Sequence, residues 1–197
     1  MSKYQICVSG AHVGDTVSHS HLLAYEIGAA IAKSGHTLTT GATTGLPQYA
    51  ALGAKDNGGL SIGFSPATSY REHIKSYHLP TKEFDYINFT GMDYVGRDLY
   101  LVHSSDAIIT VGGGMGSLHE FATALENHKF CAVLLGSGGA ADFIPTILER
   151  LAAPVDAKVI YDTDPSRLVK QVVEYLDKKY ADFKEVIKTT PRRKGQG

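Results

Sequence analysis

The residues best suited to chemistry in this chain lie between Ser105 and Glu120. An apolar run ending at Val111 is followed by a glycine-rich turn and then by a segment of helical spacing. Glycines let the backbone turn with positive φ and approach a ligand closely, and the free N–H groups at a helix start attract an anion. The pattern therefore predicts a phosphate-binding turn, and we assign to it Gly113, Gly114, Met115, Gly116 and Ser117.

Glu120 lies about one turn into that helix, where a carboxylate is unfavourable beside a phosphate. One interpretation is a capping box, Ser117-x-x-Glu120, which would stabilise the helix by roughly 1 kcal/mol. The other is that Glu120 acts on a neutral, hydroxyl-rich part of a ligand. The capping box explains the serine and the glutamate but not the glycines, which cost more unfolded-state entropy than alanine.

Apolar segments of strand type alternate with segments of helical spacing along the chain. Expected strands are residues 4–9, 36–40, 60–64, the neighbourhood of Ile87, 106–111, 130–135 and 158–161. Expected helices are residues 18–34, 45–56, 92–102, 118–128, 141–151 and 165–180. This alternation predicts an α/β fold with a doubly wound parallel sheet, a Rossmann-like single domain of three layers. We expect it to span residues 1–182, followed by a C-terminal extension, 183–197, that is flexible at its end.

Ligands of such sheets bind beyond the carboxyl ends of the strands. Segments 9–14, 40–45, 90–92 and 112–117 fall at those ends, so we add Ser9, Gly10 and Gly41 to the expected binding residues. Each segment alone also fits a tight turn, and their coincidence on one rim favours a site. The long segment 65–82, rich in Tyr, His, Pro and Ser, is expected to be an irregular functional loop.

Composition excludes several classes of protein. The chain is 43% hydrophobic and 20% charged with a formal net charge of −1, as in a soluble globular protein, so we expect no nucleic-acid or membrane partner. The one basic run, 191–194, falls in the expected tail. No apolar run approaches the roughly 20 residues of a membrane span, and the start lacks a signal-peptide pattern, so we expect a cytoplasmic protein. Cys7 and Cys131 lie in apolar runs and are expected to be buried, reduced thiols.

Familiar cofactor patterns are incomplete. The second expected strand ends without the carboxylate of an NAD site, and the glycine turn lacks the lysine of a P-loop. Thr123 stands where a zincin helix needs its second histidine, and His12, His19 and His21 are too scattered to predict a zinc site. We therefore expect no metal and no cofactor.

The spacing Arg97-x8-Asp106, followed by the 112–117 turn and Glu120, resembles the LOG family. That family carries an arginine on one helix and then the signature Pro-Gly-Gly-x-Gly-Thr-x-x-Glu. The resemblance extends to Ser9-Gly10 and to Gly41-x-x-x-Gly45, and it covers about the first two thirds of the chain. Enzymes of the family cleave the N-glycosidic bond of nucleoside 5′-monophosphates, and some release cytokinin bases. The resemblance implies that Arg97 and Glu120 are a catalytic pair, that the substrate is a small-molecule nucleotide, and that the protein is a homodimer.

The chain also departs from that family's pattern. Gly112 replaces the proline, Ser117 the threonine and His119 an acid, while Asp98 follows Arg97 where the family has a basic residue. The wider superfamily includes nucleotide-sensing proteins and molybdenum cofactor carriers. A second function therefore stays open, a nucleotide-binding or molybdenum-cofactor carrier protein without turnover.

Both members of the Arg97 and Glu120 pair are present, and this favours a phosphoribohydrolase. A simpler interpretation of Arg97 is an ion pair with Asp93, four residues earlier on a solvated helix face. Such a pair is worth only about 0.3 to 0.5 kcal/mol.

Overall fold

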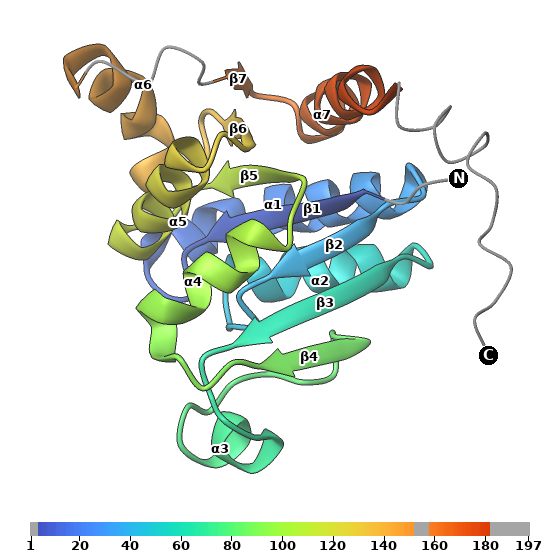
Figure 1. Cartoon of the computed structure of the whole chain (residues 1–197), viewed down its shortest axis with the longest axis vertical. Helices are drawn as coiled ribbons and strands as arrows, with labels where there is room; N and C mark the ends of the chain where they lie inside the picture. The colour runs from blue at the N-terminus through green and yellow to red at the C-terminus, as the bar shows by residue number, and fades with distance from the viewer. Residues whose placement is uncertain (1–3, 152–157, 182–197) are drawn as a thin grey trace, which may run out of the picture.

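The computed structural model describes residues 4–151 and 158–181. Within these ranges seven strands form one parallel sheet in the order β4-β3-β2-β1-β5-β6-β7 (Figure 1). The strands are β1 (Gln5–Gly10), β2 (Thr37–Thr40), β3 (Leu60–Ser65), β4 (Tyr86–Phe89), β5 (Ala107–Val111), β6 (Phe130–Leu134) and β7 (Val159–Asp162). The helices are α1 (Asp15–Lys33), α2 (Leu46–Asp56), α3 (Tyr70–Lys75), α4 (Asp93–His103), α5 (Met115–Glu126), α6 (Gly139–Leu151) and α7 (Pro165–Lys179). The expected doubly wound, three-layer α/β fold is confirmed.

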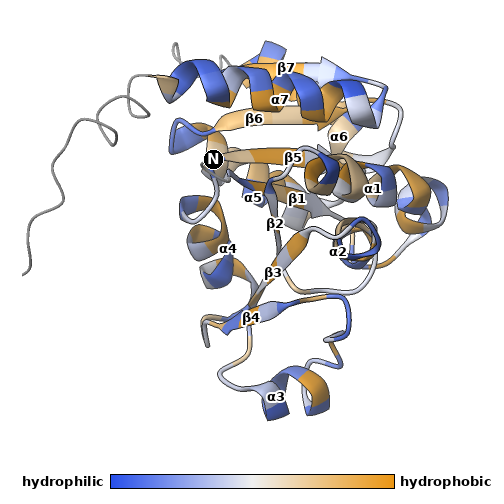
Figure 2. Ribbon diagram, turned by 90° about the vertical axis from the view of Figure 1, so that its right-hand side faces the viewer, coloured by the Kyte–Doolittle hydropathy of each residue, from blue (hydrophilic) through white to orange (hydrophobic). Residues whose placement is uncertain are grey.

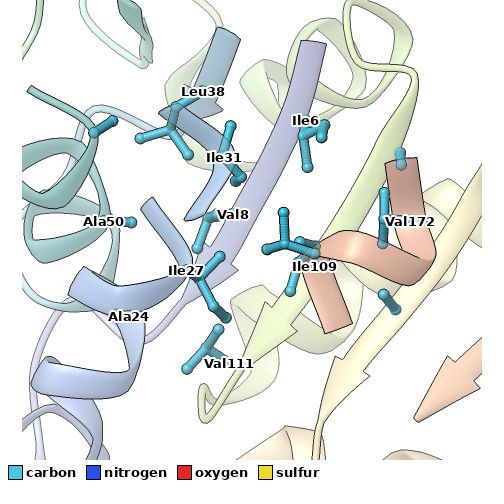
Figure 3. Close-up of a cluster of buried hydrophobic side chains, with 14 of the residues drawn as sticks. Ile6, Val8, Ala24, Ile27, Ile31, Leu38, Ala50, Ile109, Val111 and Val172 are labelled. Carbon is cyan, nitrogen blue, oxygen red and sulfur yellow. The ribbon is translucent and has the colours of Figure 1, made fainter. Parts of the chain in front are cut away.

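Two hydrophobic clusters bury the two faces of the sheet. Helices α1, α2 and α7 cover one face, and α4, α5 and α6 cover the other. Neighbouring residues of a strand point to opposite faces, so Ile6 and Val8 join the first cluster while Cys7 joins the second. Figure 3 shows Ile6 and Val8 beside Ile27 and Ile31 of α1. The central strands β5 and β6 are largely apolar on both sides, and Figure 2 shows them mainly in the colours of hydrophobic residues.

Helices α1 and α2 approach closely because each presents a glycine to the backbone of the other. A Cβ atom added at Gly28 would lie 1.9 Å from the Ala50 carbonyl oxygen, and one added at Gly53 would lie 2.0 Å from that of Tyr25. This approach fixes the start of α2 beside the loop after β1, where Leu46 N donates to Ala11 O over 2.8 Å.

The segment 65–82, expected to be irregular, contains the short helix α3, so that expectation is wrong in this respect. Ser69 caps the helix by accepting from Glu72 N. His73 is completely buried, with Nδ1 2.8 Å from Ser65 Oγ and Nε2 2.9 Å from Pro80 O. One imidazole therefore ties together both ends of a segment that lies beyond the edge strand β4 (Figure 1).

Helices α1 and α5 begin three residues earlier than expected, at Asp15 and Met115. They start directly from the glycine turns at Gly14 and Gly114, before the apolar spacing becomes visible in the sequence. Cys7 and Cys131 are buried free thiols, as expected. The boundary at residue 182, the extension 183–197 and the basic run 191–194 lie outside the described residues. In the described part of the chain, no helix combines the length and apolar character needed to cross a membrane.

We expect Gly28→Ala and Gly53→Ala to destabilise the protein, although alanine is the better helix former. Each new methyl group would meet a carbonyl oxygen of the neighbouring helix, and overpacking of this kind costs about 1 to 3 kcal/mol. At this chain length the melting temperature should fall by about 2 to 12 °C. The matched control is Gly116→Ala in α5, because Gly116 is exposed with open space around it. Equal melting temperatures for all three variants would contradict the close contact.

Candidate functional site

A cavity of about 270 Å³ opens at the carboxyl ends of β1, β2 and β5. The strand order reverses here, because β2 to β4 extend from one side of β1 and β5 to β7 from the other. This is the position at which doubly wound sheets bind ligands. The walls are formed by Gly10, Ala11, His12, Val13, Gly41, Thr43, Pro47, Tyr94, Arg97, Asp98, Gly114, Met115, Gly116, Ser117 and Glu120.

Eight of the ten expected site residues lie on these walls, and Ser9 and Gly113 do not. Ser9 is buried at the end of β1, where its hydroxyl donates to Glu120 Oε2. Gly113 shapes the turn with a φ of 94°, and its carbonyl accepts from Ala140 N over 2.9 Å. The segment 90–92 follows the carboxyl end of β4, as expected, but none of its residues lines the cavity, and the Thr90 hydroxyl donates to the Ser65 carbonyl.

The N-terminus of α5 faces this cavity. Gly112 and Gly113 have φ of 54° and 94°, a conformation that favours glycine, and Gly114 precedes the first helical residue. The first helical hydrogen bond runs from Leu118 N to Gly114 O, so the helix leaves the N–H groups of residues 115–117 without helical acceptors. Among the described residues, no side chain caps this end.

The capping-box interpretation of Ser117 and Glu120 is wrong. Ser117 is the third residue of the helix instead of its cap, and its hydroxyl packs against Gly113. The Glu120 carboxylate turns away from the helix start, toward Ser9 of β1 and Arg97 of α4.

Arg97 and Glu120 meet in a nearly water-free environment, at 4% and 7% exposed. Arg97 Nη2 lies 3.7 Å from Glu120 Oε1, and Arg97 Nη1 donates to the Phe64 carbonyl over 3.0 Å. Gly41 makes room for this guanidinium, because a Cβ atom there would lie 1.9 Å from Arg97 Nη1. The alternative of a solvated pair between Arg97 and Asp93 is wrong, since Arg97 is buried and Asp93 accepts from the Tyr77 hydroxyl.

Burial raises the pKa of Glu120 to about 7. The charge of Arg97 and the hydrogen bond from Ser9 favour the ionised form, while the negative charge of Asp98 disfavours it. Glu120 therefore changes its charge near neutral pH, which is unusual for a carboxyl group.

Asp98 and His119 extend this cluster. His119 Nδ1 lies 2.7 Å from Asp98 Oδ2, and Asp98 Oδ1 lies 3.1 Å from Arg97 Nε. These are two of the positions at which the chain departs from the LOG pattern, and they contact each other. The basic residue expected on α4 is an acid here, and the acid expected on α5 is a histidine. Sequence reasoning noted each change separately and missed that they form a pair.

Two aromatic side chains that sequence reasoning did not assign to a site stand on the cavity wall. The rings of His12 and Tyr94 have centroids 6.4 Å apart and planes inclined by 21°. The ring of Tyr77 meets Tyr94 edge-on, with centroids 5.6 Å apart and an interplanar angle of 77°. Tyr77 belongs to the segment 65–82, and the only sequence signal was the aromatic richness of that segment.

In the described ranges, no three His, Cys, Asp or Glu side chains are placed so that they could hold a metal ion together. His21, one of the scattered histidines, instead lies against the ring of Tyr49, with centroids 5.1 Å apart.

Comparisons with known proteins agree with this description. An uncharacterized protein of Archaeoglobus fulgidus is 37% identical over 134 residues, which are 68% of this chain and 82% of that protein. The molybdenum cofactor binding protein of Rippkaea orientalis is 27% identical, with a TM-score of 0.70 over 89% of this chain and 99% of that one. The molybdenum cofactor carrier protein of Chlamydomonas reinhardtii is also 27% identical, with a TM-score of 0.71 and the same coverage.

The model of the SLOG cluster4 family matches residues 3–169, nearly all of the described chain. The resemblance to LOG proteins is thereby confirmed at the level of the superfamily, and the departures fit a divergent branch. The chain belongs to the SLOG cluster4 family, whose LOG-like, Rossmann-type fold carries the cavity described above.

Proposed function

We propose that this protein binds a nucleoside 5′-monophosphate in the cavity and hydrolyses its N-glycosidic bond, releasing the free base and ribose 5-phosphate. The observation that carries the proposal is the position of Glu120, a buried carboxylate on the wall beside the open N-terminus of α5. An anion site and a carboxylate in one cavity suit the two ends of a ribose 5-phosphate group.

The phosphate would bind at the start of α5. The N–H groups of residues 115–117 and the positive end of the helix dipole favour an anion there. A phosphate in this position would keep the ribose between the start of α5 and the carboxylate of Glu120.

Glu120 would act on the ribose. As the C1′–N bond breaks, its electron pair leaves with the base and the sugar becomes oxocarbenium-like, with positive charge that a carboxylate stabilises. The oxygen of a water molecule then bonds to C1′, and a proton from that water ends on the base. A guanidinium group is a poor acid, so Arg97 would hold the carboxylate in place instead of supplying a proton.

A carrier without turnover is the second candidate. It is supported by the 27% identity to proteins named as molybdenum cofactor binding or carrier proteins. The same α5 terminus would hold the phosphate of such a ligand, and nothing in that function needs the charge of Glu120. Incubation with a panel of nucleoside monophosphates, followed by assays for free base and ribose 5-phosphate, distinguishes the two functions.

We also propose that the protein is a homodimer that pairs through α4 and α5. Four large side chains of α4 and of its N-cap residue are exposed by about half or more, namely Met92, Val95, Leu99 and Tyr100. They line a groove together with His119 and Thr123 of α5. Covering this apolar groove with the same face of a second copy would remove it from water.

A charge placed at the α5 terminus should weaken phosphate binding. In Gly116→Asp, the new carboxylate stands beside the free N–H groups, and we expect the affinity for a nucleoside 5′-monophosphate to fall roughly tenfold or more. Affinity for the nucleoside should stay unchanged, and Gly116→Asn is the neutral control of equal size. Calorimetry measures both affinities when the ligands are a C-nucleotide and its nucleoside, whose carbon–carbon bond to the base cannot be hydrolysed. If the parent binds nucleotide and nucleoside equally, the phosphate site is wrong.

Glu120→Gln should lower turnover on the order of 100-fold or more, because the variant keeps the shape of the side chain but not its charge. In the parent protein, activity should rise with pH as Glu120 ionises near pH 7. Glu126→Gln, an exposed glutamate of the same helix, is the control. Unchanged hydrolysis by Glu120→Gln would refute the catalytic assignment, and binding without turnover by the parent would favour the carrier.

Glu120→Gln should be more stable than the parent protein at alkaline pH. The folded protein keeps a proton on Glu120 up to about pH 7, whereas the unfolded chain loses it near 4.5. The free energy of unfolding therefore falls between these values, by up to about 3 kcal/mol, and levels off above pH 7. Glu120→Gln lacks this fall in the free energy of unfolding. Its melting temperature should therefore exceed that of the parent protein at pH 8 and be close to it at pH 5.

The dimer proposal predicts that Val95→Asp is monomeric, because a charge in the apolar groove cannot be buried without a partner. The control is Leu22→Asp, which changes an exposed apolar residue on the opposite layer. Light scattering at micromolar concentration reports the mass. A parent protein that is monomeric throughout would exclude the dimer.

A further inference from the structure

We propose that His12 and Tyr94 form a clamp that holds the planar heterocycle of the bound ligand by stacking on both of its faces. The inference rests on the proposed function for the position of the phosphate. It adds how the other end of the ligand is recognised, and it assigns a role to the segment 65–82.

The spacing of the two rings is the first argument. Carbon atoms in contact lie about 3.5 Å apart, so a flat ring between two parallel rings needs a separation of about 7 Å. The His12 and Tyr94 centroids are 6.4 Å apart, and their planes depart from parallel by 21°. A small rotation of either side chain therefore admits a heterocycle, and the residues are exposed enough to make that rotation.

The position of the rings is the second argument. His12 follows β1 and Tyr94 lies in the first turn of α4, so the rings stand on the wall of the same cavity that Glu120 and the α5 terminus line. A ribose 5-phosphate at α5 and Glu120 would leave its base free to reach another part of that wall. The two rings are the aromatic side chains that line the cavity.

Each ring is supported by a different part of the fold. The His12 carbonyl accepts from the Thr44 hydroxyl over 3.1 Å, which fastens the loop after β1 to the start of α2. Tyr94 receives the edge of Tyr77, and the Tyr77 hydroxyl donates to the carboxylate of Asp93, the neighbour of Tyr94.

Asp93 has a φ of 52°, a strained conformation for a residue other than glycine. The bond from Tyr77 holds this residue, so the segment 65–82 braces the Tyr94 side of the clamp. The buried imidazole of His73 fixes that segment in turn. The backbone that carries Tyr94 is thereby held in place before the ligand arrives, and this restriction lowers the entropy cost of binding.

The test compares ligands that share the phosphate but differ in the base. Formycin 5′-monophosphate is a C-nucleotide with a carbon–carbon bond to its base, so it stays intact. Ribose 5-phosphate lacks the base. We expect the parent protein to bind the C-nucleotide at least about tenfold more tightly than ribose 5-phosphate, the effect of stacking on aromatic side chains.

Tyr94→Leu and His12→Leu should each lose roughly tenfold in affinity for formycin 5′-monophosphate and keep the affinity for ribose 5-phosphate. Tyr94→Phe keeps the ring and should bind like the parent. Tyr86→Leu is the matched control, because Tyr86 is an exposed tyrosine of β4 that lines neither the cavity nor the α4 groove. Melting temperatures of all variants check that the fold is retained.

Failure of the clamp and failure of the proposed function give different results. The clamp is overturned if the parent protein binds formycin 5′-monophosphate and ribose 5-phosphate with equal affinity, or if Tyr94→Leu loses the same affinity for both compounds. Either result leaves the phosphate site in place. The parent protein could instead bind the nucleoside formycin as tightly as its 5′-monophosphate, and Tyr94→Leu could abolish this binding. That result supports the clamp and refutes the phosphate site. A parent that binds none of the three compounds refutes both.

Discussion

The buried contact between Arg97 and Glu120 is the constraint on which the arrangement of the site depends. The guanidinium reaches a carbonyl of β3 and passes over Gly41 after β2, while the carboxylate takes a hydrogen bond from Ser9 of β1. Helices α4 and α5 must therefore pack so that Arg97 and Glu120 both reach the carboxyl ends of β1, β2 and β3. Removing two charges from water is costly, so the pair is weak evidence for stability and fits a functional role better.

The glycines near the cavity serve this constraint in different ways. Gly41 gives space to a side chain, whereas Gly113 supplies a backbone turn that other residues adopt only with strain. Helix α5 starts at once from that turn, so its unpaired N–H groups and Glu120 are held in a fixed relation along one helix. The site is assembled at the point where the strand order reverses, the position that this sheet topology offers to a ligand.

Much of the fold can be predicted from the sequence, because most strands and helices leave a pattern within a few neighbouring residues. Buried parallel strands are continuous apolar runs, and a glycine turn before a helix is recognisable without knowledge of its neighbours. The pairing of Asp98 with His119 depends on how α4 packs on α5, and the aromatic pair joins residues more than eighty positions apart. Helix α3 is too short to show a period, and it depends on the Ser69 cap and the burial of His73. Gly41 was predicted as a binding residue, but its need to admit Arg97 appears only in three dimensions.

The pair of Asp98 and His119 also restricts how this branch of the family can change by single substitutions. Asp98 is buried, so a basic residue at position 98 alone would place a second cation beside Arg97 and would leave the ring of His119 without its partner. An acid at position 119 alone would face the carboxylate of Asp98 and stand next to Glu120. At the buried position 98 an uncompensated charge costs on the order of 3 to 5 kcal/mol, whereas at position 119, where the side chain is nearly half exposed, water screens part of the repulsion. A change between the LOG arrangement and the present one is therefore less costly when both positions change together.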